Sequence, residues 1–234
     1  MLDSWSSIVF GMECLGCGAV SGSLDPWLCP DCRKTLENVS KEMRRPRDDV
    51  VSLFPMEKLT RRLVHLLKYR SIPGMAAYLV GHSCMMQGCP ENLFPDFVPP
   101  LYFVPVPLHR ARFRERGYNQ AEMVARALAE RTGGRVCRWL RRKVFRVSQT
   151  KLTRGERESN VSGAFEAKLP KQLPVRGTVV VVDDVYTTGA TTGACMDAFG
   201  KDFPLDMKVC TLLYDMPVSA TMDYVADRRA FWNP

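Results

Sequence analysis

The sequence predicts an α/β fold with a mainly parallel sheet, preceded by a small N-terminal module that contains four cysteines. One observation behind this prediction is the run of four valines at 179–182, which is typical of a strand buried on both faces of a parallel sheet. A second is the repeated order of strand, loop and helix from residue 101 onward. The third is a pair of Cys-x-x-Cys turns, Cys14 with Cys17 and Cys29 with Cys32, at the spacing of metal ligands.

The expected helices and strands follow in chain order. Leucines at helical spacing predict a helix over residues 58–69, which Pro73-Gly74 ends. The apolar run 101–106 predicts a strand, and Asn119 is a suitable cap for a helix through Glu130. The inner face of that helix would carry Ala121, Val124, Ala125 and Leu128. Further along, we expect one or two strands within 136–147, the valine strand at 179–182, a helix through Phe199 and a last strand at 207–213.

The chain divides into three expected parts. Residues 1–40 form the four-cysteine module, 41–100 form a linker and a helical hood segment, and 101–234 form the large domain. The charged stretch Lys41–Asp49, with Pro46 inside it, is the expected linker. A 40-residue module has almost no core, so its folding should depend on its metal, whereas the large domain should have an independent core.

Composition indicates a globular protein. The 234 residues are 46% hydrophobic and 25% charged, values near the globular average. No apolar run approaches the roughly 18–20 residues that a membrane-spanning helix needs. No Lys or Arg precedes the apolar residues Ile8-Val9-Phe10, so a secretory signal is not expected. The expected compartment is the cytoplasm.

The positive charge is concentrated in one segment. The whole chain carries a formal charge of +8, but residues 110–157 contain 13 Arg and 2 Lys against 4 Glu. That segment is therefore basic while the remainder is slightly acidic. Such a cluster favours a polyanionic partner, and the preference for arginine is typical of bidentate phosphate contacts. The alternative is a solvated surface helix.

The four N-terminal cysteines predict a structural zinc site. Two Cys-x-x-Cys turns brought together offer four thiolates in a tetrahedral arrangement, as in zinc-ribbon-like modules. Gly16, Gly18 and Pro30 stand where tight turns need them. Two disulfides, a redox pair and an iron site of rubredoxin type are the alternatives. No second four-ligand pattern includes the other five cysteines, which are Cys84, Cys89, Cys137, Cys195 and Cys210.

The residues after the valine run form a candidate phosphate-binding loop. Asp183 and Asp184 are followed by Thr187, Thr188, Gly189, Ala190 and Thr191 and then by a helix. A glycine-containing turn at a helix N-terminus offers backbone N–H groups to a phosphate, and the carboxylates can bind sugar hydroxyls. The chain contains neither G-x-x-x-x-G-K-[ST] nor G-x-G-x-x-G, which excludes P-loop and dinucleotide-binding motifs.

The stretch 179–191 resembles the signature of the type I phosphoribosyltransferases, which bind phosphoribosyl pyrophosphate (PRPP). Other segments resemble one branch of that superfamily, the ComF/GntX family of competence and DNA utilisation. The resemblance rests on the four-cysteine module and on three segments that follow it in order. These are Val104-Pro105-Val106-Pro107-Leu108-His109, Arg116-Gly117-Tyr118-Asn119-Gln120, and the series Arg146, Gln149, Leu152, Arg157, Asn160, Val161, Ala164 and Phe165.

The resemblance implies a fold of the type I phosphoribosyltransferase kind and specific roles for the loop residues. Asp183 and Asp184 would be the catalytic carboxylates that hold the ribose 2- and 3-hydroxyls. Mg²⁺ would enter with PRPP. The 5-phosphate would lie in a cradle made by Thr187, Thr188, Gly189, Ala190 and Thr191.

Two further loops are expected to face the same cleft. His109 and Arg110 follow a strand and are candidates for the pyrophosphate, although His109 could equally serve only as a turn cap. Residues 148–165 have the composition of a lid that would bring Gln149, Arg154 and Arg157 onto the ligand, or of a disordered surface loop.

Three functions are compatible with these observations. The first is a PRPP-binding accessory protein of DNA uptake, with single-stranded DNA and other competence proteins as partners. The second is an active phosphoribosyltransferase that releases pyrophosphate, on an acceptor that the sequence does not identify. The third is a single-stranded DNA-binding protein with a non-catalytic transferase fold. For the DNA contact we expect Arg112, Arg114 and Arg116, which together with Arg110 would share one face of an extended chain.

Overall fold

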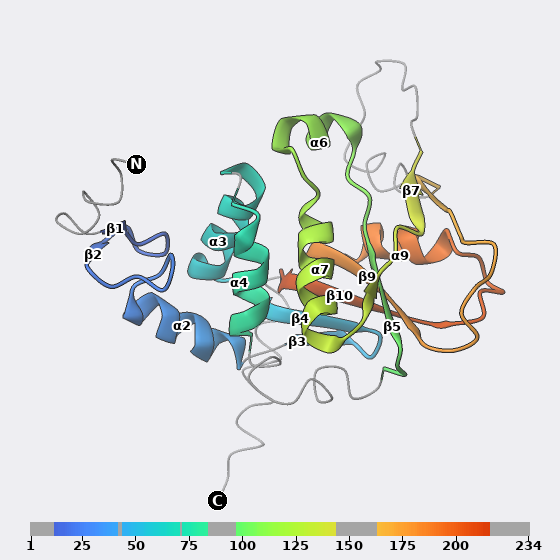
Figure 1. Cartoon of the computed structure of the whole chain (residues 1–234), viewed down its shortest axis with the longest axis horizontal. Coiled ribbons are helices and arrows are strands. Elements are labelled where there is room, and N and C mark those ends of the chain that lie inside the picture. Colours follow the sequence, from blue (N-terminus) through green and yellow to red (C-terminus); the bar gives the residue numbers. More distant parts are fainter. Residues whose placement is uncertain (1–11, 42–43, 71, 84–96, 144–162, 216–234) are drawn as a thin grey trace, which may run out of the picture.

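The computed structural model describes residues 12–41, 44–70, 72–83, 97–143 and 163–215. Its centre is a six-stranded sheet in the order β3-β4-β10-β9-β5-β6, flanked by helices (Figure 1). The strands are β3 (Arg44–Arg47), β4 (Val50–Pro55), β5 (Leu101–Pro105), β6 (Arg135–Val136), β9 (Thr178–Tyr186) and β10 (Asp206–Tyr214). All pairs are parallel except β3 with β4, so the predicted mainly parallel α/β fold is confirmed. None of the described helices has the length and apolar character to span a membrane.

The hood segment supplies part of this sheet. Sequence analysis expects a linker at 41–49, but Arg44–Arg47 form the antiparallel edge strand β3, so that expectation is wrong there. The following strand β4 is buried along its whole length and pairs with β10. The linker prediction failed because β3 pairs with the adjacent strand β4, which β10 holds in the sheet, and this pairing outweighs the local run of charge. The central sheet therefore begins well before residue 101.

One face of the sheet is covered by three helices, α3 (Lys58–Tyr69), α4 (Gly74–His82) and α7 (Gln120–Thr132) (Figure 1). The α3 helix has the bounds that its leucine spacing predicts. Asn119 caps α7 by accepting a hydrogen bond from the Ala121 N–H at 3.1 Å, which confirms its predicted role. Val180 and Val182 face these helices in one core cluster, because alternate residues of a strand point to the same side.

The opposite face carries a second, smaller core. The helix α9 (Ala190–Asp197) packs there beside a two-stranded sheet of β7 (Leu140–Arg142) and β8 (Phe165–Ala167). Val179 and Val181 point into this cluster together with Cys195 of α9. The valine run is thus buried on both faces, as expected for a central parallel strand.

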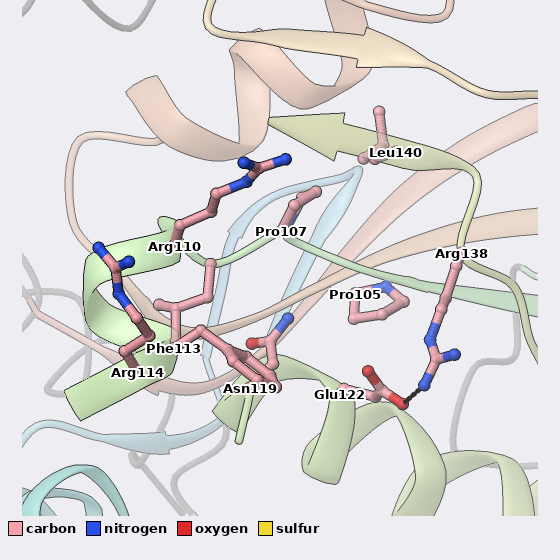
Figure 2. A pocket seen from close by; sticks show the side chains of 10 residues that line it. Pro105, Pro107, Arg110, Phe113, Arg114, Asn119, Glu122, Arg138 and Leu140 are labelled. Atoms are coloured by element: carbon pink, nitrogen blue, oxygen red, sulfur yellow. Dashed lines mark hydrogen bonds and ion pairs between the residues drawn. The ribbon is translucent and has the colours of Figure 1, made fainter. Parts of the chain in front are cut away.

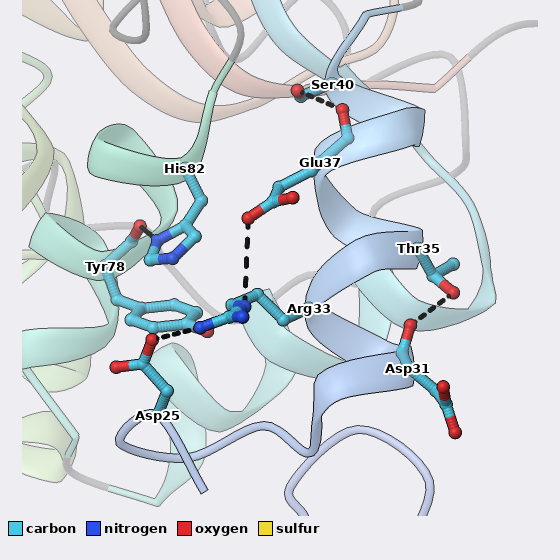
Figure 3. Close-up of polar contacts among 8 residues, drawn as sticks. All are labelled: Asp25, Asp31, Arg33, Thr35, Glu37, Ser40, Tyr78 and His82. Atoms are coloured by element: carbon cyan, nitrogen blue, oxygen red, sulfur yellow. Dashed lines mark hydrogen bonds and ion pairs between the residues drawn. The ribbon is translucent and has the colours of Figure 1, made fainter.

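The N-terminal module packs directly on the helices of the larger part. It consists of β1 (Met12–Glu13), β2 (Val20–Ser21) and α2 (Pro30–Ser40), with α2 beside α3 and α4. Figure 3 shows Arg33 of α2 placed between Asp25 and Glu37, on the side of the helix that faces Tyr78 of α4. Leu28, Leu36 and Val39 are buried in the same cluster as the residues of α3 and α4. The module therefore shares its core with the large domain.

The arginine-rich segment after β5 is helical. Arg110–Arg116 form α6, which stands clear of the sheet and buries none of its residues (Figure 1). It ends at Gly117, whose φ of 79° lies in the left-handed region that favours glycine. The extended conformation considered for these arginines is therefore wrong, and they cannot all share one face.

Candidate functional site

The proposed phosphate loop lies at the carboxyl end of β9 and forms a small pocket of about 40 Å³. Because β4, β5, β9 and β10 are parallel, their carboxyl ends meet at this edge, where ligands bind in open α/β sheets. The pocket brings together the five predicted phosphate-binding residues and the first of the two carboxyls; these are Asp183, Thr187, Thr188, Gly189, Ala190 and Thr191.

Gly189 is required by the shape of the loop. Its φ is 77°, and a Cβ at this position would lie 2.4 Å from the Tyr186 hydroxyl oxygen. Gly189 is also the N-cap residue of α9, where no side chain caps the helix. The Ala190 N–H donates a long hydrogen bond of 3.4 Å to Thr188 Oγ1. The first turn of α9 can still present N–H groups to an anion, and the helix dipole favours a negative charge there.

The pKa of the Asp183 carboxyl lies close to neutral pH. Burial raises its pKa first, and the neighbouring charge of Asp184 raises it further, to about 7. The Asp184 backbone N–H, which donates to Asp183 Oδ1 at 2.8 Å, opposes this shift, as do the charges of Lys68 and Arg142. Asp183 can therefore either donate or accept a hydrogen bond close to neutral pH.

Asp184 occupies a different environment. Consecutive residues of a strand point to opposite faces, so Asp184 points toward α3 while Asp183 points toward α9. Lys68 Nζ on α3 lies 3.0 Å from Asp184 Oδ1. The expectation from the sequence is that both carboxyls bind one ribose. In the structure Asp183 lines the loop pocket, whereas Asp184 is paired with Lys68 of the hood segment, residues 41–100.

His109 caps α6 at the end of β5. Its Nδ1 accepts a hydrogen bond from the Ala111 N–H at 3.2 Å, so the neutral ring carries its proton on Nε2. His109 therefore does act as a cap, and the element that it caps is the helix α6. The exposed Nε2–H remains able to donate to a phosphate, so the two roles are compatible.

A basic groove lies beside this cap, which we call the arginine groove. Two neighbouring pockets of about 370 and 500 Å³ form it and share Pro107, Leu108, Arg110 and Leu140. The larger pocket is also lined by Arg141, Arg142 and Lys143 of the β7 region. The smaller contains Phe113, whose ring is half exposed (Figure 2). Glu122 also lines the smaller pocket and is paired with Arg138, so the groove combines an apolar floor with mainly cationic walls.

The arginines of α6 divide into two pairs. Arg110 and Arg114, one helical turn apart, both line the smaller pocket, and neither has an acidic partner among the described residues (Figure 2). Arg112 instead forms an ion pair with Glu115 at 2.9 Å. Arg116 donates to Gln120 at 2.9 Å and lies over the Tyr69 ring, 5.0 Å from its centroid. Of the three arginines predicted for DNA, only Arg114 faces the groove.

Other predicted residues cannot be placed. Gln149, Arg154 and Arg157 of the expected lid lie outside the described residues. Three residues near the site were not predicted from the sequence: Lys68, Arg141 and Arg142. Their positions next to a strand end become visible only when the sheet order is known.

The four N-terminal cysteines form a cluster suited to a metal ion. The Sγ atoms of Cys14, Cys17, Cys29 and Cys32 all lie within 4.8 Å of one another, and the described residues contain no other such group. Burial raises the pKa of Cys14, but backbone hydrogen bonds, first from Cys29, outweigh it and lower the pKa to about 6. A Cβ on Gly16 would lie 2.8 Å from Cys32 Sγ, so the turn admits no larger residue without movement.

Relatives of known name share most of the chain. DNA utilization protein YhgH of Salmonella typhimurium is 31% identical over 179 residues, which cover 70% of this chain and 74% of that protein. The protein of the same name from Escherichia coli K12 is 35% identical, over 71% and 75%. Competence protein F of Haemophilus influenzae is 37% identical over 102 residues, covering 39% of this chain and 41% of that protein.

Two other comparisons add little. No protein-family model matches the sequence. The structure of Leishmania donovani UMP synthase is similar over 83% of this chain and 34% of that one, at 15% identity and a TM-score of 0.36, which supports no argument. The identity and coverage of the DNA utilization proteins are sufficient by themselves. The chain belongs to the ComF family of competence protein F and DNA utilization protein YhgH.

Proposed function

We propose that this protein binds PRPP, with Mg²⁺ carried on the ligand, and acts in DNA utilisation or competence. The observation that supports this most strongly is the pocket that joins Asp183 to the threonine loop at the N-terminus of α9, where the N-cap residue is a glycine. A ribose 5-phosphate has a phosphate at one end and vicinal hydroxyls at the other. One loop in this pocket offers complementary groups to both.

The proposed binding mode assigns a task to each group. The N–H groups of the first turn of α9, with the hydroxyls of Thr187, Thr188 and Thr191, would donate to the 5-phosphate. Asp183 would bind a ribose hydroxyl. His109 Nε2–H and Arg110 would face the pyrophosphate from the end of β5, which shares the sheet edge with β9. When bound, Mg²⁺ would neutralise charge on the pyrophosphate.

We further propose that the protein transfers the phosphoribosyl group and releases pyrophosphate. A ribosyl cation-like state forms as pyrophosphate departs, so cationic groups at the leaving group matter more than a nucleophile. The imidazole of His109 and the guanidinium of Arg110, which has no acidic partner among the described residues, provide such groups.

We also propose that the four-cysteine cluster holds a structural zinc ion. A closed set of four thiolates is the usual ligand set of structural zinc, and it leaves no position open for catalysis. The cluster lies in the module that packs on α3 and α4. Zinc would therefore fix the module against the helices that cover the sheet.

Single-stranded DNA binding is a second candidate function, favoured by the arginine groove. Proteins that bind single strands combine cationic walls for the backbone with aromatic side chains on which bases stack. Arg110, Arg114 and the half-exposed Phe113 offer this combination. Tyr118 does not, because its hydroxyl donates to the Leu67 carbonyl and its ring packs against the core.

One ligand titration tests the first candidate directly. Calorimetry with PRPP, ribose 5-phosphate and a nucleoside monophosphate, each with and without Mg²⁺, compares the relevant ligands. We expect PRPP with Mg²⁺ to bind most tightly and ribose 5-phosphate to bind more weakly at the same site. Equal affinity for all three, or no binding of PRPP, would count against the proposal.

A further inference from the structure

The last turn of α3 reaches the acidic pair of β9 from the helical layer. Lys68 Nζ lies 3.0 Å from Asp184 Oδ1, and the two side chains are only 23% and 15% exposed. Charged groups this well covered are less screened by water than a surface pair. Among the described residues, Lys68 is the one cation that forms an ion pair with either of the two carboxyls.

The neighbours of Lys68 on α3 are held in place by the α6–α7 connection. The Tyr118 hydroxyl donates to the carbonyl of Leu67, directly before Lys68. Arg116 Nη2 lies 3.4 Å from the hydroxyl of Tyr69, directly after it, with the guanidinium over the ring. The backbone position of Lys68 is therefore fixed from both sides.

Titratable side chains from three described elements lie near the acidic pair. Lys68 approaches from α3, Arg142 from β7 and the Cys195 thiol from α9. Lys68 and Arg142 both favour the ionised form of Asp183, whereas burial and Asp184 oppose it. Removal of the Lys68 charge would therefore make the ionised form of Asp183 less favourable.

We propose that Lys68 is a positioning residue for the acidic pair: its ion pair with Asp184 holds that side chain against α3, so that Asp183 alone enters the loop pocket. Lys68 thereby makes the hood segment part of the binding site. It also offsets negative charge that would repel a polyphosphate ligand arriving at the same strand end. This inference rests on the proposed binding of PRPP.

The test compares three forms of Lys68. Lys68→Met keeps the length of the side chain and removes its charge, Lys68→Arg keeps the charge, and Lys58→Met alters an exposed lysine on the same helix as a control. PRPP affinity with Mg²⁺ is measured by calorimetry from about pH 6 to pH 9, which spans the titration of Asp183. Thermal unfolding of each variant is measured in parallel.

We expect Lys68→Met to weaken PRPP binding roughly tenfold at neutral pH, as the loss of a charge-assisted contact does. The pH at which affinity is half-maximal should move upward, because the lost cation no longer favours ionised Asp183. Lys68→Arg should retain most of the affinity, and Lys58→Met should match the unaltered protein. A purely structural role would lower the melting temperature and leave the pH midpoint unchanged.

Failure of the inference and failure of the proposed function can be told apart. If the unaltered protein binds PRPP and Lys68→Met binds it equally, with the same pH midpoint, the inference is overturned. If the unaltered protein does not bind PRPP, the proposed function fails. In that case carboxyl-detected NMR titration decides about Lys68: an upward shift of the Asp183 pKa in Lys68→Met supports its positioning role, and an unchanged pKa refutes it.

Discussion

The indole of Trp27 meets the ring of Tyr78 edge-on, with centroids 5.4 Å apart and planes inclined by 66°. Trp27 belongs to the four-cysteine module and Tyr78 to α4, so this contact joins the two parts of the chain. Gly74 at the start of α4 makes the approach possible, because a Cβ there would lie 3.0 Å from Trp27 Cη2. The module therefore shares a core cluster with the helices that cover one face of the sheet.

Removal of one zinc ligand should therefore affect the whole protein. Cys29→Ser should abolish zinc binding, since apparent free energies of such sites are roughly 10–16 kcal/mol in small modules. Because the module shares its core with α3 and α4, we expect one unfolding transition at a lower temperature. Metal analysis and calorimetry measure both effects.

The control for the zinc prediction is Cys137→Ser, which alters a partly buried cysteine outside the cluster. This variant should keep its metal. Absence of zinc from unaltered protein purified without chelator would contradict the site itself. A separate low-temperature transition of the module, with the remainder unchanged, would contradict the shared core.

The acidic pair should determine affinity for PRPP without determining the fold. Asp183→Asn with Asp184→Asn removes the charge-assisted hydrogen bond of Asp183 to the ribose, worth about 1.5–3 kcal/mol, and the ion pair of Asp184 with Lys68, so affinity should fall at least about tenfold. Thr188→Val should also weaken binding, because it removes a hydroxyl that would donate to the 5-phosphate. Asp197→Asn, an exposed change at the end of α9, is the matched control. Unchanged calorimetric affinity in the double variant would refute the ribose assignment.

Asp183 should also leave a signature in the pH dependence of stability. Its pKa rises from 3.8 to about 7 on folding, chiefly through burial, so the folded state binds the proton more tightly than the unfolded state. As the pH rises from 3.8 to about 7, ionisation of Asp183 therefore lowers the free energy of unfolding. Below pH 3.8 Asp183 is protonated in both states and does not lower it.

Urea unfolding at several pH values tests this prediction. The free energy of unfolding of Asp183→Asn, relative to the unaltered protein, should increase as the pH rises from about 4 to about 7, because asparagine does not ionise. Asp197→Asn serves again as a control. A difference between Asp183→Asn and the unaltered protein that stays constant over this range would show that Asp183 ionises normally.

Local patterns predicted the elements better than they predicted the site. The bounds of α3, the cap at Asn119 and the burial of the valine strand all depend on nearby residues, and the structure confirms them. The contact of Lys68 with Asp184 depends on which helix covers which face, and no local pattern carries that information. The arginines of α6 show the same limit: period-two spacing fits one face of a strand, but a capped helix forms instead.

The two faces of α6 provide the sharpest test of DNA binding. Arg110 and Arg114 line the arginine groove without acidic partners among the described residues, whereas Arg112 and Arg116 are engaged on α6 and α7. Each phosphate neutralised on a single strand contributes a slope of about −0.7 to the log–log dependence of affinity on salt. Replacing Arg110 and Arg114 by Ala should therefore flatten the slope for an oligothymidylate by roughly 1.4.

The matched double variant changes Arg112 and Arg116 to Ala on the same helix. It removes the same formal charge, so a diffuse electrostatic effect would flatten the slope equally in both variants. A direct contact predicts flattening only for the groove pair, because Arg112 is paired with Glu115 and Arg116 is held by Gln120 and the Tyr69 ring. Equal slopes in both double variants, or no oligonucleotide binding by the unaltered protein at low salt, would remove the groove as a nucleic-acid site. Arg110 would then be left with the pyrophosphate alone, and the small-molecule function would be favoured.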